Sequence, residues 1–298
     1  MQVADSSSMD PVMANPTLGP LLELDARIAK LGSKIRVLGA LAWPVEMEAR
    51  FLDSWRAGKP EMPAPPSQPV DHAATMAALD EIMRKLDRGH PIGDWLYKTA
   101  WSYRIAAEML ASVGTPRFTE CSMLLYGHPS TKYRSQETTT LQAADSMLAI
   151  TDQLIDSRYV PQVPYDIHAT DFAVRLRARI DPFFTDDPVQ VVLDAALASK
   201  AAAGSKVIRI RADAMFSELD LDQLVEHEAF IHSATLLNGK RQPWLRCLGV
   251  GAPRTTRTQE GLATFSEIIT GAMDINRLRR LALRVLRLQE GLSGADFI

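Results

Sequence analysis

The 298-residue chain is poor in cysteine and in net charge, and it lacks long apolar runs. Its two cysteines, Cys121 and Cys247, are too few and too far apart for a disulfide framework or a thiolate zinc site, so we expect packed thiols in a reduced, cytoplasmic setting. A formal charge of −3 gives no electrostatic reason to expect nucleic-acid binding. No apolar run is long enough to span a membrane, and the first residues lack the basic and apolar regions of a signal peptide.

What the chain does contain is typical of a globular protein, with 46% hydrophobic and 23% charged residues. Residues 1–19 hold Ser, Pro, Asn and Gly without apolar periodicity, which predicts a mobile tail. Residues 20–298 are predicted to form a single domain. The proline-rich stretch 58–69 is interpreted as an extended connector within that domain.

Apolar spacing predicts mostly helical structure. One stripe begins at Leu21 and Leu24 and is predicted to extend through Ile35, Leu38 and Leu41. Further helices are predicted over 71–87, 94–113, 139–156, 168–180 and 274–289. The last of these is basic, and we expect a solvated outer face carrying Arg277, Arg279, Arg280, Arg284 and Arg287, although a helix that binds a membrane surface or an acidic partner has the same pattern.

Short β-rich runs predict a small sheet. Val189–Leu193 and Val207–Arg211 are predicted strands, and Lys200–Gly204 lies between them, which favours a hairpin-like unit. Met123–Tyr126 is predicted to be a further short strand that leads into the turn Gly127-His128-Pro129.

The stretch His227-Glu228-Ala229-Phe230-Ile231-His232 combines two imidazoles with a carboxylate. Imidazole suits zinc, and an uncoordinated Glu nearby can take a proton from activated water. The histidines are five residues apart, so on an ideal helix they diverge by about 140°. Both can reach one metal only through a π-type turn between about Glu226 and Ala234. Two ordinary histidines on a half-buried helix explain this stretch alone equally well.

A helix that Ser217 or Asp220 caps and Asn238-Gly239 ends is predicted to carry these histidines. A second helix is predicted to start at Thr256, because Thr256 and Gln259 have the spacing of a capping box. It would place Glu260 in its first turn, bury Leu262, Phe265 and Ile269, and let another backbone approach Gly261. Glu260 is a candidate third metal ligand or, alternatively, a carboxylate that complements the helix dipole.

Together, H-E-x-x-x-H and the pentapeptide Gln259-Glu260-Gly261-Leu262-Ala263 resemble a domain-of-unknown-function group that includes the microtubule-associated tyrosine carboxypeptidases. Its bacterial members are the flavohaemoglobin expression-modulating Q-E-G-L-A motif proteins. Leu125–Pro129, Ser199–Gly204 and Leu237–Pro243 fit the same group, and the resemblance runs from about Leu21 to the end. Relatives continue with a further basic and aromatic segment, so we expect this chain, which stops at Ile298, to be a shortened member.

The resemblance implies that His227, His232 and Glu260 bind Zn²⁺ and that Glu228 is the general base. It also implies an α+β fold, a predominantly helical zincin-like metallopeptidase domain with a small sheet flanking the H-E-x-x-x-H helix. The expected function is a carboxypeptidase-like zinc peptidase that acts on the C-terminus of a peptide or protein. Candidate ligands of the terminal carboxylate, chosen for proximity in sequence to the metal motifs, are Lys200, Arg209, Arg254 and Arg257.

Two alternatives to an enzyme remain open. The chain could be a non-catalytic regulatory or binding protein that retains the zinc site. The zinc could also serve only to stabilise the fold, although two His and one carboxylate leave a coordination position open, whereas closed structural sites use four Cys or His ligands. The sequence leaves the substrate's identity and the oligomeric state open.

Overall fold

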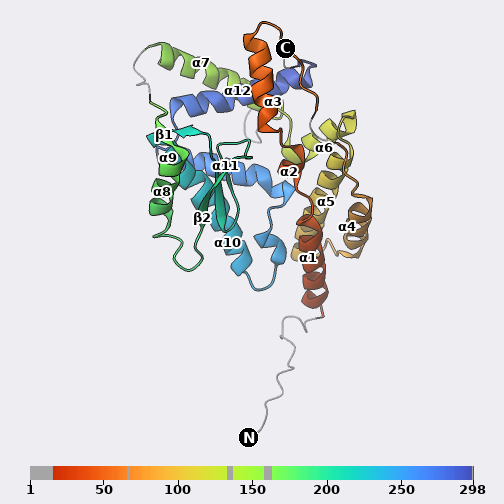
Figure 1. The fold of residues 1–298 in the computed structure, drawn as a ribbon. Coiled ribbons are helices and arrows are strands. Elements are labelled where there is room, and N and C mark those ends of the chain that lie inside the picture. Colours follow the sequence, from red (N-terminus) through yellow and green to blue (C-terminus); the bar gives the residue numbers. More distant parts are fainter. Residues whose placement is uncertain (1–15, 66–67, 133–136, 158–162, 297) are drawn as a thin grey trace. The chain divides into compact units, whose positions relative to one another are not determined.

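A computed structural model describes residues 16–65, 68–132, 137–157, 163–296 and 298 (Figure 1). Internal contacts divide the chain into two compact units, described separately below. The first unit comprises Met1–Ala40, Pro69–Leu125 and Asn238–Thr256, and the second comprises Leu41–Gln68, Tyr126–Leu237 and Arg257–Ile298. Most of the predicted tail lies outside the described residues, and the single domain over 20–298 stays a prediction. No helix in the described part of the chain has the length and apolar character that crossing a membrane requires.

The first unit is a small helical assembly. Its helices α1 (Leu18–Gly32), α4 (Ala73–Lys85) and α5 (Pro91–Ala111) pack against one another, and the short 3₁₀ helix η2 (Arg246–Gly249) packs on α1. The buried carboxylate of Asp25 accepts hydrogen bonds from the backbone N–H groups of Arg246 and Cys247, at 2.5 and 3.1 Å. These bonds satisfy backbone donors at the start of η2 and fix it to α1.

The second unit holds the strands. In chain order it contains α3 (Val45–Arg56), α7 (Thr140–Asp156), β1 (Ile167–His168), α8 (Ala169–Ile180), β2 (Gln190–Asp194), β3 (Ala201–Ala203), β4 (Val207–Arg211), β5 (Met215–Phe216), α9 (Glu218–Leu224), the π-helix η1 (Val225–Ser233) and α12 (Ile275–Leu292). Four helices contain residues of both units: α2 (Val37–Leu41), α6 (Pro116–Tyr126), α10 (Ala234–Arg241) and α11 (Pro253–Ile269).

A three-stranded sheet in the order β2-β4-β3 supports the π-helix. β2 runs parallel to β4, with Val191 opposite Ile208, and β3 runs antiparallel to β4, with Ala202 opposite Arg209. Helix α8 and η1 both contact this sheet, and Phe172 of α8 stacks on Phe216 with ring centroids 4.1 Å apart. This apolar core includes Val225 and Ala229 of η1, so one side of the π-helix is fixed by hydrophobic burial.

The structure confirms the mostly helical α+β class and the predicted helices that correspond to α4, α5, α7, α8 and α12. Helices α7 and α12 lie side by side (Figure 1). Strands β2 and β4 are also confirmed, but they run parallel to each other; the hairpin in this region is formed by β3 and β4, which are antiparallel and separated by residues 204–206.

Two further predictions in the N-terminal half are wrong. Met123–Tyr126 is the end of α6 and not a strand; Pro116 at the helix start and Gly127 with φ of 94° just after its end are the helix signals that the short apolar run concealed. Helix α1, which carries the first stripe, ends at Gly32, where the ring of Tyr103 leaves no room for a Cβ atom. Ile35 beyond it is buried as predicted, but Leu38 is exposed, so the buried face does not extend that far.

Asn238-Gly239 does not end the histidine-bearing helical stretch, because α10 continues to Arg241. Gly239 is needed for a close approach: a Cβ atom there would lie 1.9 Å from the carbonyl oxygen of Leu248. The glycine therefore marks a contact between two backbones of the first unit and not a helix C-terminus.

We expect Gly239→Ala to lower the free energy of unfolding by about 1–3 kcal/mol, because the added methyl group must displace the Leu248 backbone. Gly291→Ala in α12 is the matched control, since nothing lies within 4 Å of its Cβ position and alanine favours helix by up to about 1 kcal/mol. Urea denaturation measures both. Equal stability of the two variants would contradict the proposed close approach.

Candidate metal centre

A nine-residue π-helix carries both histidines. η1 spans Val225–Ser233 and continues directly from α9 into α10. Its i→i+5 hydrogen-bonding pattern brings residues five apart to the same side, which a regular α-helix cannot do. The imidazoles of His227 and His232 accordingly lie together, with ring centroids 4.8 Å apart. The predicted π-type turn is confirmed.

Side-chain hydrogen bonds hold the start of α9 and the end of η1. Of the two predicted caps, Ser217 and Asp220, the N-cap of α9 is Ser217, which forms a reciprocal capping box with Asp220. At the other end of η1, the hydroxyl of Ser233 donates a 2.8 Å hydrogen bond to the carbonyl of Gly204, which directly follows β3. The π-helix is thus anchored to the sheet.

Glu260 of α11 joins the two histidines. Its Oε2 atom lies 3.5 Å from His227 Nε2, and its Oε1 atom lies 3.6 Å from His232 Nε2. All three possible ligand atoms lie within 4.8 Å of one another. Within the described ranges, this is the one group of three or more His, Cys, Asp or Glu side chains close enough to hold an ion. Two imidazole nitrogens and a carboxylate oxygen form a possible site for a divalent metal.

Glu228 lies beside His227 in η1 and is half-buried. Its negative charge acts on His227, but no hydrogen bond or ion pair joins its carboxylate to another described residue. A half-buried carboxylate beside the three clustered side chains is free to contact a water molecule or a substrate.

Helix α11 begins earlier than predicted, at Pro253 and not at Thr256. Proline is favoured at the first helical position because its missing N–H would be unpaired there. Glu260 therefore lies beyond the first turn, which weakens the alternative that it only complements the helix dipole. Gly261 faces open space, so the predicted backbone approach at this glycine is wrong.

The face of α11 that packs inward is also not the predicted one. Leu262, Phe265 and Ile269 are 43%, 55% and 65% exposed, so the predicted buried stripe is wrong. The buried residues of this segment are instead Ala263, Ser266 and Glu267. Polar contacts to η1, together with the small side chain of Ala263, determine the orientation of this helix.

Glu267 is the site residue that the sequence motifs did not identify. Its side chain is fully buried, and Oε1 lies 2.5 Å from His227 Nδ1. Arg277 of α12 donates two hydrogen bonds to the same carboxylate, at 2.5 and 2.7 Å. A third donor, the amide of Gln223, lies 3.4 Å away. The available signal was the seven-residue separation from Glu260, which puts both carboxylates on one face of a helix.

Arg277 consequently does not belong to the solvated basic face predicted for α12, because its guanidinium is mostly buried against Glu267. Arg279 does fit that prediction more closely, since it is partly exposed and pairs with Asp152 of α7 at 2.5 Å. A second contact joins α11 to η1, where Ser266 donates a 2.9 Å hydrogen bond to Glu226.

Opposing effects set the proton affinities in the cluster. Burial lowers the pKa of His227, but hydrogen bonds to Glu260 and Glu267 outweigh this effect and raise its pKa to about 9. The hydrogen bond from His227 lowers the pKa of Glu260 against the effect of burial. Burial raises the pKa of Glu267, yet the hydrogen bonds from Arg277 and His227 leave its pKa below the usual value. Without a metal, the site therefore holds a protonated imidazole between two carboxylates.

A family model described as microtubule-associated tyrosine carboxypeptidase matches residues 49–298. The chain belongs to the microtubule-associated tyrosine carboxypeptidase family. The resemblance drawn from the H-E-x-x-x-H and Q-E-G-L-A motifs is confirmed, and both motifs lie within the matched residues. No curated protein and no solved structure matches the chain. Membership in this family suggests carboxypeptidase-like activity on a peptide or protein.

Four basic residues are predicted to bind the terminal carboxylate of a substrate. Three of them already form a hydrogen bond or an ion pair within the protein. Lys200 Nζ donates to Asp220 at 3.0 Å, Arg209 pairs with Asp194 at 3.7 Å, and Arg254 of the first unit donates to the backbone carbonyl of Trp95 at 3.0 Å. Their role in substrate binding stays a prediction.

Arg257 differs from these three. It lies on α11 one turn before Glu260, is exposed, and has no carboxylate partner among the described residues. Its guanidinium lies against Gly127, 3.5 Å from the position that a Cβ atom would occupy. Gly127 has a φ of 94°, which other residues rarely adopt, and this backbone conformation accounts for the glycine.

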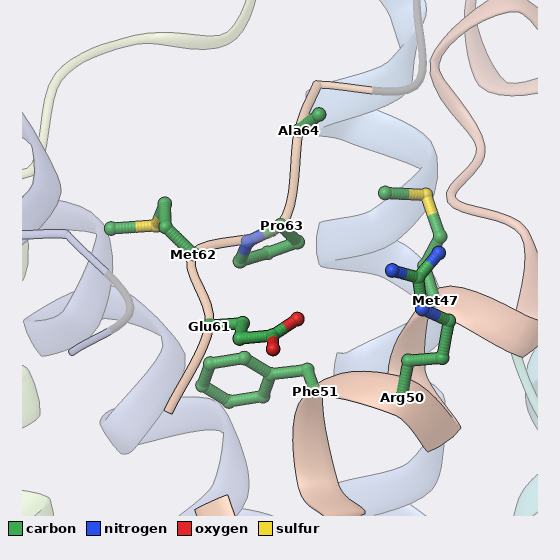
Figure 2. A pocket seen from close by; sticks show the side chains of 7 residues that line it. All are labelled: Met47, Arg50, Phe51, Glu61, Met62, Pro63 and Ala64. Carbon is green, nitrogen blue, oxygen red and sulfur yellow. The ribbon is translucent and has the colours of Figure 1, made fainter. Parts of the chain in front are cut away.

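A separate hollow lies between α3 and the proline-rich segment (Figure 2). Its volume of about 200 Å³ is below the range of roughly 300–1,000 Å³ usual for ligand sites. None of the candidate metal, base or carboxylate-binding residues lines it; its walls are formed by Met47, Arg50, Phe51, Glu61, Met62, Pro63 and Ala64. We therefore do not assign the substrate to it.

We expect the metal-free protein to lose stability between about pH 6.5 and 9. His227 has a higher pKa in the folded chain than its ordinary value of about 6.5, so its stabilising contribution is fully present below pH 6.5 and disappears as the pH rises through about 9. The loss should be on the order of 3 kcal/mol. Urea unfolding of chelator-treated protein at several pH values measures it.

His227→Gln should remove this decline, whereas His72→Gln, a change outside the cluster, should preserve it. Added zinc should reverse the trend, because a metal requires the deprotonated imidazole and binds more tightly as the pH rises. Parallel pH profiles for metal-free wild type and His227→Gln would contradict the assignment of the transition to His227.

Proposed function

We propose that this chain is a zinc-dependent peptidase that removes residues from the C-terminus of a peptide or protein. The observation that carries the proposal is the convergence of His227, His232 and Glu260, produced by a π-helix in a member of a carboxypeptidase family. A π-turn is rare and occurs often at functional sites. Two His and one carboxylate is a ligand set of zinc peptidases, and it leaves a position open for chemistry.

The separations between each histidine and the nearer oxygen of Glu260 are compatible with zinc. With ligand bonds of about 2.0–2.2 Å, neighbouring ligands of a tetrahedral zinc lie roughly 3.3–3.6 Å apart. The distances from Glu260 to His227 and His232 are 3.5 and 3.6 Å. Nitrogen and carboxylate donors without thiolates suit Zn²⁺ in a catalytic site. Zinc bound here would supply Lewis-acid activation of water and of the scissile carbonyl.

Glu228 is proposed as the general base. It accepts a proton from the attacking water and donates it to the leaving amine. Its position beside His227 and the absence of a hydrogen-bonding partner among the described residues support this role, because an acceptor already occupied by Arg or Lys would be a weaker base. By the same criterion, Glu267 is unsuitable because Arg277 and His227 occupy its oxygens.

We expect Glu228→Gln to reduce peptide hydrolysis by about 10² to 10⁴-fold, because the amide keeps the size of the side chain but cannot act as a base. Zinc content, measured by elemental analysis, should stay near one per chain. Hydrolysis is followed by mass spectrometry of a peptide library with free C-termini.

Glu218→Gln is the matched control for this experiment. It makes the same chemical change in the same continuous helical stretch, but Glu218 pairs with Arg175 at the surface and should leave the rate unchanged. A hydrolysis rate that Glu228→Gln does not alter would overturn the proposed mechanism. No hydrolysis by a wild-type chain that binds zinc and a partner would favour the binding protein instead.

Arg257 is the proposed ligand of the substrate carboxylate. It is the candidate among the four whose guanidinium has no ion pair or hydrogen bond within the described residues, and it lies one helical turn from Glu260. A guanidinium can bind a carboxylate through two parallel hydrogen bonds.

Arg257→Ala should lower kcat/KM about 10- to 100-fold for peptides with a free C-terminus, which is the usual value of a hydrogen bond to a charged group. Cleavage of C-terminally amidated peptides should not change, because they lack the carboxylate. Arg209→Ala, whose residue is exposed and pairs with Asp194, is the control and should behave as wild type. The opposite pattern would transfer the role from Arg257 to Arg209.

A further inference from the structure

The ring of His227 is contacted on both nitrogens by carboxylates of one helix. Nε2 faces Glu260 at 3.5 Å, and Nδ1 faces Glu267 at 2.5 Å. In a neutral imidazole one nitrogen carries the proton and the other is free to bind a metal. A carboxylate at Nδ1 favours the tautomer with the proton on Nδ1, which leaves the Nε2 lone pair directed toward Glu260 and His232.

The position of Glu267 is itself determined by α12. Arg277 donates to both carboxylate oxygens, at 2.5 and 2.7 Å. In the segment that precedes α12, the backbone N–H of Met273 donates to the backbone carbonyl of Glu267 at 2.9 Å. The carboxylate is fully buried, so its charge requires these donors. Arg277 is mostly buried as well, and its guanidinium forms an ion pair with Glu267.

We infer that Glu267 and Arg277 form a positioning pair that orients His227 toward the metal and makes α12 part of the metal centre. Neither residue contacts the ion or the substrate. Glu267 holds the imidazole through Nδ1, and Arg277 holds Glu267. The inference rests on the proposed function in that it assumes that His227 binds a metal. Partners of this kind typically contribute 10- to 100-fold to metal affinity.

The decisive experiment measures zinc affinity by competition with a chromophoric chelator, and it does not depend on hydrolysis. We expect Glu267→Gln to weaken zinc binding by about 10- to 100-fold, because an amide holds the Nδ1–H less strongly and presents its own donors to Arg277. Arg277→Gln should weaken binding in the same direction, and Arg277→Lys, which keeps the charge, should restore part of the loss. If Arg277 acts only through Glu267, the double variant Glu267→Gln/Arg277→Gln should bind zinc no more weakly than Glu267→Gln alone.

Arg279→Gln is the matched control. Arg279 lies two residues from Arg277 on α12 and also pairs with a carboxylate, Asp152, but that pair joins α12 to α7 and does not reach the histidines. It should lower stability without changing zinc affinity. Circular dichroism establishes that each variant is folded. If Glu267→Gln does not fold, the zinc affinity is measured instead on Glu267→Asp and Arg277→Lys. The shorter side chain of Glu267→Asp withdraws the carboxylate from Nδ1.

The outcomes separate this inference from the proposed function. Wild-type affinity in a folded Glu267 variant, or an equal loss in Arg279→Gln, would overturn the positioning pair while leaving the metal site intact. Failure of the wild-type chain to bind zinc would overturn both proposals. Zinc binding that depends on Glu267, in a chain that hydrolyses no peptide, would support the positioning pair and reject the peptidase.

Discussion

The five-residue separation of His227 and His232 is the constraint on which this site depends. Regular α-helical geometry would direct the two rings about 140° apart, so the backbone must wind more widely between them. Long π-helical segments are rare, and nine residues of this winding need support from their surroundings. That support comes from Val225 and Ala229 in the apolar core, from the bond between Ser233 and the end of β3, and from α11.

The contribution of α11 explains why its apolar residues point outward. Glu260 and Glu267 share one face because they are seven residues apart, and both must approach His227. Burying a large apolar side chain completely stabilises the fold by roughly 1.5–3 kcal/mol. Leu262, Phe265 and Ile269 are already about half-buried, so turning the helix to bury them would gain about half of that free energy for each. It would also break a buried charge pair, at a cost of about 3–5 kcal/mol, and remove the bond between Ser266 and Glu226. The polar contacts are therefore sufficient to decide the orientation.

The sequence was informative where chemistry requires a fixed spacing. His227, His232 and Glu260 could be selected, and the π-helix predicted, because five residues are incompatible with one metal on a regular helix. Glu267 cannot be identified from the sequence, because a second carboxylate two turns after Glu260 indicates a site residue only once the buried face of α11 is known. Thr256 and Gly239 were misinterpreted for a related reason. Each fits a local capping signal, but α11 starts at Pro253, and Gly239 lies inside α10 because the Leu248 backbone approaches it there.

Charge explains why one cluster can prefer either a proton or a metal ion. Glu228, Glu260 and Glu267 together bring three negative charges, against the single positive charge of Arg277. With both imidazoles neutral, the metal-free site is left with an excess of two negative charges, which a protonated His227 partly relieves. A divalent ion would neutralise the same excess completely, and to bind it His227 must release its proton from Nε2 while keeping the Nδ1 proton that faces Glu267. The raised proton affinity of His227 and the proposed affinity for zinc thus have one electrostatic cause, in which Arg277 limits how negative the site becomes.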